Sequence, residues 1–162
     1  MKVRSAKQSD LAEIVEIYNQ TIDSRMVTAD TEYQTVEQKQ AWFDSHNTKR
    51  PLYVIEQGNR VVAWLSFKSF YGRPAYDSTV EIAIYVDTKC RGLSLGQTLL
   101  AYALELASTL QIHNYLAFIF SHNTPSVKLF EKFGFEKWGQ LPNVAEMDGK
   151  KYSLTILGKV IN

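Results

Sequence analysis

The first apolar pattern in the chain predicts a helix near the N-terminus, after a possible short strand at Lys2-Val3-Arg4. Apolar residues then recur with the i, i+3, i+4, i+7 spacing of one helix face, at Leu11, Ile14, Val15 and Tyr18. Asp10 and Glu13 have the spacing of a capping box, so this helix is expected to begin at Asp10.

A second helix is expected from Thr35, because Gln38 follows three residues later and apolar residues come after it. Between the two helices, residues 21–34 are polar and irregular. This segment is expected to form a loop or a short helix over a binding cleft.

The middle of the chain changes to β-branched and aromatic stretches, which predict strands at 52–56, 60–70 and 79–86. Gly58-Asn59 separates the first two strands. Because both residues tolerate positive φ, they predict a two-residue hairpin turn. Glu81 is embedded in the third strand, between two apolar neighbours.

After residue 86 the period changes to that of a helix. A turn at residues 90–96 leads into a long helix, whose apolar face consists of Leu95, Leu99, Tyr102, Ala103, Leu106 and Leu110. A strand at 115–120, a helix at 123–133 and a last strand at 151–157 follow. This order predicts an α+β fold, a mixed sheet with helices on its faces.

Composition narrows the class of protein. Residues 1–162 suit one domain, and the net charge of +1 argues against a dedicated nucleic-acid-binding protein. No apolar stretch approaches bilayer length, so we expect a soluble, cytoplasmic protein rather than a membrane protein. Cys90 is the only cysteine, and the three histidines lack metal-ligand spacing, so neither a disulfide nor a metal site is expected.

The turn before the long helix has features of a phosphate site. Gly92 and Gly96 allow a pyrophosphate to approach the backbone, the helix N-terminus presents free N–H groups, and Arg91 adds a positive charge. The G-x-x-x-x-G-K-S/T and G-x-G-x-x-G patterns are both absent. Taken alone, the segment is equally consistent with a plain structural turn.

The order of motifs resembles the GNAT acetyltransferase superfamily, in particular its phosphinothricin and methionine sulfoximine N-acetyltransferase branch. The resemblance covers nearly the whole chain. Its pieces are Ile17-Tyr18-Asn19, Ala41-Trp42-Phe43, Arg73-Pro74-Ala75, Thr79-Val80-Glu81, Ile84-Tyr85-Val86, Arg91-Gly92-Leu93-Ser94-Leu95-Gly96 and Asn123 through Phe135.

The resemblance implies a twisted, mostly antiparallel sheet that splays open at a parallel pair of central strands, where acetyl-CoA enters as cosubstrate. It places the pantetheine arm along Ile84, Tyr85 and Val86. It places the pyrophosphate on the turn and the helix start, which comprise Arg91, Gly92, Leu93, Ser94, Leu95, Gly96 and Gln97. Asn123 and Ser126 are implied to lie near the cofactor as well.

The implied reaction is direct attack of a neutral amine on the thioester, so a group must accept a proton. Glu81 is the candidate base, acting through a water; the alternative is that it lies on a solvated face of an antiparallel strand. Arg73 is the implied contact for an acid group of the acceptor, and its alternative is an ordinary surface loop. Pro74, Ala75, Ile82 and Ala83 are expected beside the same acceptor pocket.

Ser94 and Phe130 are among the positions that depart from the family pattern. Ser94 stands where the phosphate turn usually has glycine, and Phe130 stands where a Tyr or His can protonate the leaving thiolate. The expected substrate is a small amino-acid-like amine, and the resemblance also implies a homodimer. Two alternatives are a GNAT enzyme for another amine, such as a polyamine, aminoglycoside or peptide N-terminus, and a non-catalytic acyl-CoA sensor.

Overall fold

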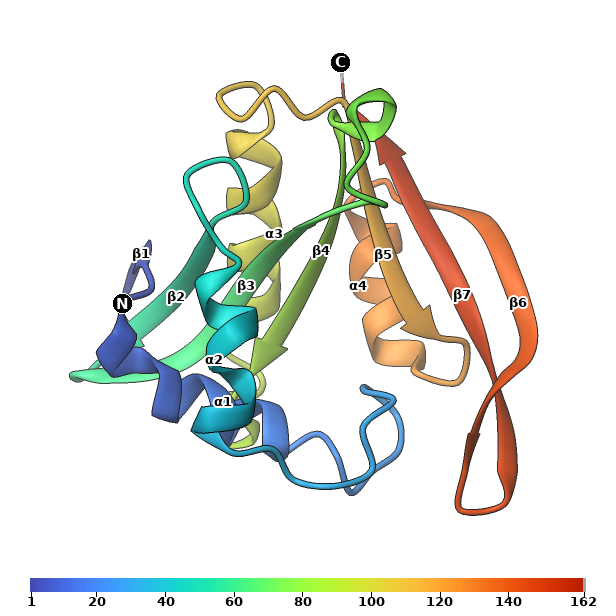
Figure 1. Cartoon of the computed structure of the whole chain (residues 1–162), viewed down its shortest axis with the longest axis horizontal. Helices are drawn as coiled ribbons and strands as arrows, with labels where there is room; N and C mark the ends of the chain where they lie inside the picture. Colours follow the sequence, from blue (N-terminus) through green and yellow to red (C-terminus); the bar gives the residue numbers. More distant parts are fainter. Residues whose placement is uncertain (162) are drawn as a thin grey trace.

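One seven-stranded sheet forms the centre of the computed structural model, which describes residues 1–161 (Figure 1). The strands are β1 (Lys2–Ser5), β2 (Leu52–Gln57), β3 (Arg60–Ser69), β4 (Thr79–Val86), β5 (Asn114–Phe120), β6 (Glu136–Met147) and β7 (Lys150–Val160). Their order across the sheet is β1-β2-β3-β4-β5-β7-β6. Every neighbouring pair is antiparallel except β4 and β5, which confirms the predicted α+β, mostly antiparallel sheet.

The parallel pair separates soon after it forms. The register joins Thr79 to Asn114, Val80 to Tyr115 and Glu81 to Leu116, and no pairing between β4 and β5 follows. The two strands diverge from this end in Figure 1. Residues 82–86 therefore pair only with β3 and leave their other edge open.

Helices cover both faces of the sheet. They are α1 (Leu11–Asn19), α2 (Val36–Asp44), α3 (Leu95–Leu106) and α4 (Thr124–Lys132), with one-turn 3-10 helices at η1 (Gln8–Asp10), η2 (Pro74–Tyr76) and η3 (Thr88–Cys90). α1 and α2 lie in front of the sheet in Figure 1, and α3 and α4 lie behind it. Successive side chains of β3 point to opposite faces of the sheet. Trp64 packs with residues of α1 on one face, whereas Leu65 and Phe67 pack with residues of α3 on the other.

Local sequence signals explain several element ends. The Gln38 N–H donates to Thr35 Oγ1 (3.1 Å) and the Thr35 N–H donates to Gln38 Oε1 (2.8 Å), so the predicted capping box before α2 is confirmed. Gly58 and Asn59 have φ values of 58° and 62°, as the predicted hairpin turn requires. The strand predicted at 79–86 is β4.

The capping box predicted at Asp10 is wrong. α1 begins at Leu11, and the Asp10 side chain makes no cap hydrogen bond to it. Its carboxylate instead accepts the Lys7 N–H (2.8 Å) and both terminal nitrogens of Arg4 (2.8 and 2.9 Å). An ion pair with Arg4, six residues earlier in the chain, therefore holds the carboxylate that the spacing had assigned to the helix cap.

Other boundaries also differ from the sequence predictions. The long helix α3 ends at Leu106, so Leu110 lies beyond it. Residues 21–34 form turns and bends, which is the loop alternative of the prediction. β6 was missed because it is an exposed outer strand with two register shifts, which disturb its apolar alternation. The Asp148-Gly149 turn that joins it to β7 has positive φ at both residues and was a usable hairpin signal.

Candidate active site

Glu81 occupies the point where β4 and β5 part. It is the last β4 residue paired with β5, and on its other side it pairs with Lys68 of β3. Its side chain is half-buried, and this burial raises the pKa of the carboxyl, while the positive charge of Lys68 opposes the rise. Glu81 is therefore not a carboxylate on a fully solvated face.

Three cavities meet at Glu81. The first, of about 150 Å³, lies between α1, α2 and the sheet and is lined by Ile14, Val15, Tyr18, Lys39, Trp42, Trp64, Ser66, Lys68, Glu81, Ala83 and Tyr85. We call it the helix-side cavity. A second, of about 70 Å³, lies in the split and is lined by Val27, Glu81, Ile82, Ala83, Ile84, Tyr85, Ala117, Phe118, Ile119, Asn123, Ser126 and Phe130. We call it the split cavity.

The third and largest cavity has a volume of about 720 Å³. It extends from Glu81 and Lys68 to the aromatic loop after β3 and to β6, where Tyr71, Tyr76, Trp138 and Leu141 line it. We call it the loop-side cavity. A group bound in any of the three cavities can thus approach the same carboxylate.

The split cavity brings together residues predicted for the pantetheine arm. Ile84 and Tyr85 line it, and Val86 continues the same open edge of β4. Asn123 is buried, and its Oδ1 accepts the Ser126 N–H (3.3 Å), so it caps α4 while lining the cavity. An extended amide chain can pair with such an open strand edge.

The predicted phosphate turn leads directly into α3. Arg91, Gly92 and Leu93 are exposed, and Gly92 has a φ of 80°, which favours glycine. Ser94 is the N-cap in a left-handed conformation (φ 59°, ψ 27°), and its side chain makes no cap hydrogen bond. The first N–H groups of α3, at Leu95, Gly96 and Gln97, therefore remain available to an anion.

Helix packing is a second reason why a glycine is required at position 96, besides access for a phosphate. A Cβ built on it would lie 3.1 Å from Leu129 Cδ2 on α4. The missing side chain lets α3 and α4 pack closely. A larger residue at Gly96 would consequently disturb helix packing as well as any bound phosphate.

Arg73 lies apart from the other predicted acceptor residues. It is exposed at the start of η2, together with Pro74 and Ala75, and is not among the residues that line the three cavities. Ile82 and Ala83 do line cavities beside Glu81. Of the predicted acceptor residues, the structure thus brings together Glu81, Ile82 and Ala83 and leaves residues 73–75 at the rim.

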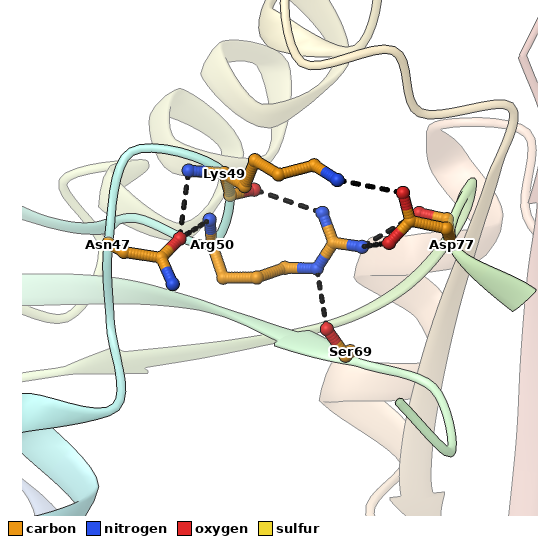
Figure 2. Close-up of polar contacts among 5 residues, drawn as sticks. All are labelled: Asn47, Lys49, Arg50, Ser69 and Asp77. Carbon is orange, nitrogen blue, oxygen red and sulfur yellow. Dashed lines mark hydrogen bonds and ion pairs between the residues drawn. The ribbon is translucent and has the colours of Figure 1, made fainter. Parts of the chain in front are cut away.

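A polar cluster holds the base of the loop that carries Arg73 (Figure 2). The buried Arg50 donates from Nε to Ser69 Oγ (2.9 Å) and from a terminal nitrogen to the Asp77 carbonyl (2.7 Å). Lys49 adds an ion pair with Asp77 (2.7 Å), and Asn47 Oδ1 accepts the N–H groups of Lys49 and Arg50 (both 2.9 Å). Both ends of the loop are therefore tied to the segment before β2.

Sequence reasoning missed the aromatic and basic lining of the helix-side cavity. Trp64 and Tyr85 stack there with ring centroids 4.4 Å apart, and Lys39 and Lys68 reach the same cavity. These residues come from α2, β3 and β4, so no spacing links them. The β3–β4 register pairs Trp64 with Tyr85 and Lys68 with Glu81. This register is known only from the structure, so the sequence alone offered no sign of the cavity.

Phe130 is buried in the wall of the split cavity and has no group that can donate a proton. Ser126 and Tyr85 are the hydroxyl-bearing residues among those that line this cavity, and the Tyr85 ring stacks on Trp64 in the helix-side cavity. Among residues 1–161, no cluster of three or more His, Cys, Asp or Glu side chains is placed to hold a metal ion. Within the same range, none of the helices has the length and hydrophobicity needed to cross a bilayer.

Known proteins that resemble this chain are acetyltransferases, which agrees with a cavity suited to acetyl-CoA at the split in the sheet. Residues 3–156 match the family model described as the acetyltransferase (GNAT) domain. A Bacillus subtilis protein named as a candidate phosphinothricin acetyltransferase is 55% identical, with full coverage of both chains. An L-methionine sulfoximine/L-methionine sulfone acetyltransferase of Pseudomonas aeruginosa is 30% identical over 96% of this chain and 91% of its own.

The fold also matches that of a protein whose crystal structure is known. The crystal structure of a candidate phosphinothricin N-acetyltransferase superposes with a TM-score of 0.96 at 54% identity, covering 99% of this chain and 98% of that one. The splayed sheet and its flanking helices are thus shared with a protein solved by experiment.

Proposed function

The chain belongs to the GNAT acetyltransferase family and is an acetyl-CoA-dependent N-acetyltransferase, and we propose that its acceptor is the primary amine of a small amino-acid-like molecule. One observation carries the proposal: the half-buried Glu81 carboxylate lies where the split cavity meets the helix-side cavity. A thioester in the first cavity and an amine in the second would meet beside this carboxylate.

The residues present fit acetyl-CoA. The open edge of β4 at Ile84, Tyr85 and Val86 supports an extended pantetheine arm, since unpaired strand groups can hydrogen-bond its amides. The free N–H groups at the start of α3 and the exposed Arg91 support a pyrophosphate at the turn. Asn123 and Ser126 line the split cavity beside the same edge of β4.

In the proposed reaction the acceptor nitrogen forms a bond to the thioester carbon and the carbon–sulfur bond breaks. The amine proton passes to the Glu81 carboxylate, directly or through one water. The raised pKa of Glu81 suits this role, because a base accepts a proton more readily as its pKa approaches the working pH. A backbone N–H on the open edge of β4 can stabilise the oxyanion that develops.

The acceptor class follows from the relatives and from the size of the helix-side cavity. Phosphinothricin, methionine sulfoximine and methionine sulfone, which the relatives' names print, are all α-amino acids. The helix-side cavity of about 150 Å³ suits a small molecule, since a void of this size holds a molecule such as benzene. A polyamine or an aminoglycoside would need a longer and more acidic site.

A thiol-release assay with acetyl-CoA tests this function. The acceptors are phosphinothricin, methionine sulfoximine, methionine sulfone, common amino acids, polyamines, aminoglycosides and short peptides. We expect release with the amino-acid acceptors. Release only with another class would discard the proposed acceptor, and tight coenzyme A binding without any release would favour an acyl-CoA sensor.

We propose in addition that the enzyme is a homodimer. β6 exposes Trp138, Leu141 and Val144, and its apolar residues continue the surface of the loop-side cavity. Burying them against a second copy would be favourable. Sedimentation equilibrium tests this: a molar mass near twice the 18.5 kDa of the chain is expected, and a monomer at all concentrations would reject it.

A further inference from the structure

The helix-side cavity contains two lysines that the reaction itself does not use. Lys39 reaches the cavity from α2 and Lys68 reaches it from β3, and Glu81 is the one acidic residue in its lining. Two positive charges and one negative charge thus share a cavity with aromatic walls. This arrangement matches a ligand that carries both an amine and an acid group.

Lys39 has no carboxylate at ion-pair distance among residues 1–161. Its Nζ lies 4.3 Å from the ring centroid of Tyr18 and 5.4 Å from that of Trp42. Burial lowers the pKa of Lys39, and the charge of Asp30 opposes part of this fall. The Asp30 carboxylate itself accepts a hydrogen bond from the Tyr18 hydroxyl. A partly buried ammonium group without a counter-ion is stabilised when an anion binds beside it.

Lys68 has no ion-pair partner in the same range either, and it lies directly opposite Glu81 in the β3–β4 register. An α-amino acid carries its amine and its carboxylate on one carbon. An acceptor whose amine lies at Glu81 must therefore place its carboxylate within a few ångströms of the same point. Lys68 occupies that neighbourhood.

We propose that Lys39 and Lys68 together bind the α-carboxylate of the acceptor in the helix-side cavity, while Glu81 lies at its amine. The inference rests on the proposed amino-acid acceptor and assigns the acid-binding role to these lysines rather than to Arg73. The cavity then selects against polyamines and other polycations, because two ammonium groups repel them.

Steady-state kinetics with a matched pair of acceptors tests the proposal. L-Methionine sulfone and 3-(methylsulfonyl)propan-1-amine have the same chain and differ by the carboxylate. Lys39→Met and Lys68→Met remove a charge but keep an unbranched side chain, and each should raise KM for methionine sulfone about 10- to 100-fold. KM for the amine without a carboxylate, and KM for acetyl-CoA, should stay within about twofold.

Three controls keep the result specific. Lys39→Arg retains the charge and should restore most of the affinity for methionine sulfone. Lys2→Met removes an exposed lysine from β1 at the far edge of the sheet and should change neither KM. Circular dichroism melting of each variant identifies a loss that comes from unfolding, and Lys68→Met tests the site independently if Lys39→Met folds poorly.

Several outcomes would overturn the inference while leaving the proposed function intact. They are an equal rise in KM for both acceptors, no rise in either single variant or in the double variant, and a carboxylate-selective loss in Arg73→Ala alone. The proposed function fails differently, when the wild-type enzyme releases no thiol with any α-amino acid. In that case the lysine assignment falls with it.

Discussion

At the scale of single residues, burial and charge act in opposite directions on Glu81, the proposed base. Glu81 is half-buried on β4, and Lys68 faces it across the strand pair. Burial destabilises the charged carboxylate, and the neighbouring ammonium group stabilises it. The net effect is a raised pKa for Glu81, and Lys68 makes the rise smaller.

Replacing Glu81 tests the base directly. Glu81→Gln should lower kcat/KM for the amine about 10²- to 10⁴-fold, since Gln cannot accept the proton, while the Kd for acetyl-CoA measured by calorimetry stays the same. An unchanged kcat/KM would remove Glu81 from the reaction.

The same substitution tests the effect of Glu81 on stability. Because its pKa is raised in the folded protein, ionised Glu81 opposes folding as the pH rises above 4.5, the ordinary pKa of a glutamate. The Tm of Glu81→Gln at pH 8 should therefore equal or exceed that of the wild type.

The pH dependence of the rate tests the coupling between Glu81 and Lys68. The wild-type kcat/KM should fall as pH drops and Glu81 is protonated. Because the charge of Lys68 lowers the pKa of Glu81, Lys68→Met should move this acidic limb to higher pH with the same acceptor. Using the amine without a carboxylate separates this effect from acceptor binding. Superimposable profiles for both proteins would show that the two charges are not coupled.

Ser94 provides a third residue-scale prediction. Its left-handed backbone costs an L-residue roughly 1–2 kcal/mol, and the extra chain entropy of glycine offsets about half of that. Ser94→Gly should gain roughly 0.5–1 kcal/mol and raise Tm by about 1–4 °C, without weakening acetyl-CoA binding. Ser94→Ala keeps the unfavourable backbone and is the matched control. A gain in Ser94→Ala equal to that in Ser94→Gly would contradict the backbone explanation.

At the scale of elements, the site depends on how strands and loops are held relative to one another. The open edge of β4 exists because the pairing with β5 stops at Glu81. Gly96 lets α3 pack closely against α4, where a Cβ would lie 3.1 Å from Leu129 Cδ2. The loop between β3 and β4 is fixed at its base by Arg50, whose guanidinium group reaches Ser69 and the Asp77 carbonyl (Figure 2).

Removing Arg50 should loosen this loop. Arg50→Met leaves the Ser69 hydroxyl and the Asp77 carbonyl without their donor, which should cost about 1–3 kcal/mol and speed amide hydrogen exchange over residues 70–77. Lys49→Met breaks only the exposed ion pair with Asp77 and should change exchange and Tm little. Equal effects of the two substitutions would show that the buried hydrogen bonds do not hold the loop.

At the scale of the whole molecule, acetyl-CoA is expected to join two halves of a sheet that are paired over only three residue pairs at β4 and β5. Acetyl-CoA at 100 times its Kd should stabilise the fold by about 2.7 kcal/mol. For a chain of this size that corresponds to a rise in Tm of about 5–11 °C. Hydrogen exchange should slow mainly at residues 82–86 and at the start of α3. Protection confined to other segments would place the cofactor elsewhere.

The sequence by itself determined the features that depend on neighbours a few residues away. The capping box at Thr35, the Gly58-Asn59 turn and the alternation of β4 follow from interactions within one turn or one strand, so they were predictable. The proposed roles of Glu81 and of the turn before α3 came instead from the resemblance to a family, and they stay predictions. The signal at Asp148-Gly149 was equally local, and it would have revealed β6.

Only the tertiary structure decided which distant residues meet. The end of the β4–β5 pairing opened the split, the β3 register placed Lys68 opposite Glu81, and the packing of α2 brought Lys39 to the same cavity. Arg4 drew Asp10 away from the helix cap that its spacing predicted. The strand pairings and the packing of α2 join residues more than ten positions apart, whereas Arg4 and Asp10 are six residues apart. The energies of all these contacts depend on burial and geometry that no local pattern encodes. The reaction class was therefore visible in the sequence, whereas the shape and charge of the helix-side cavity arose from the fold.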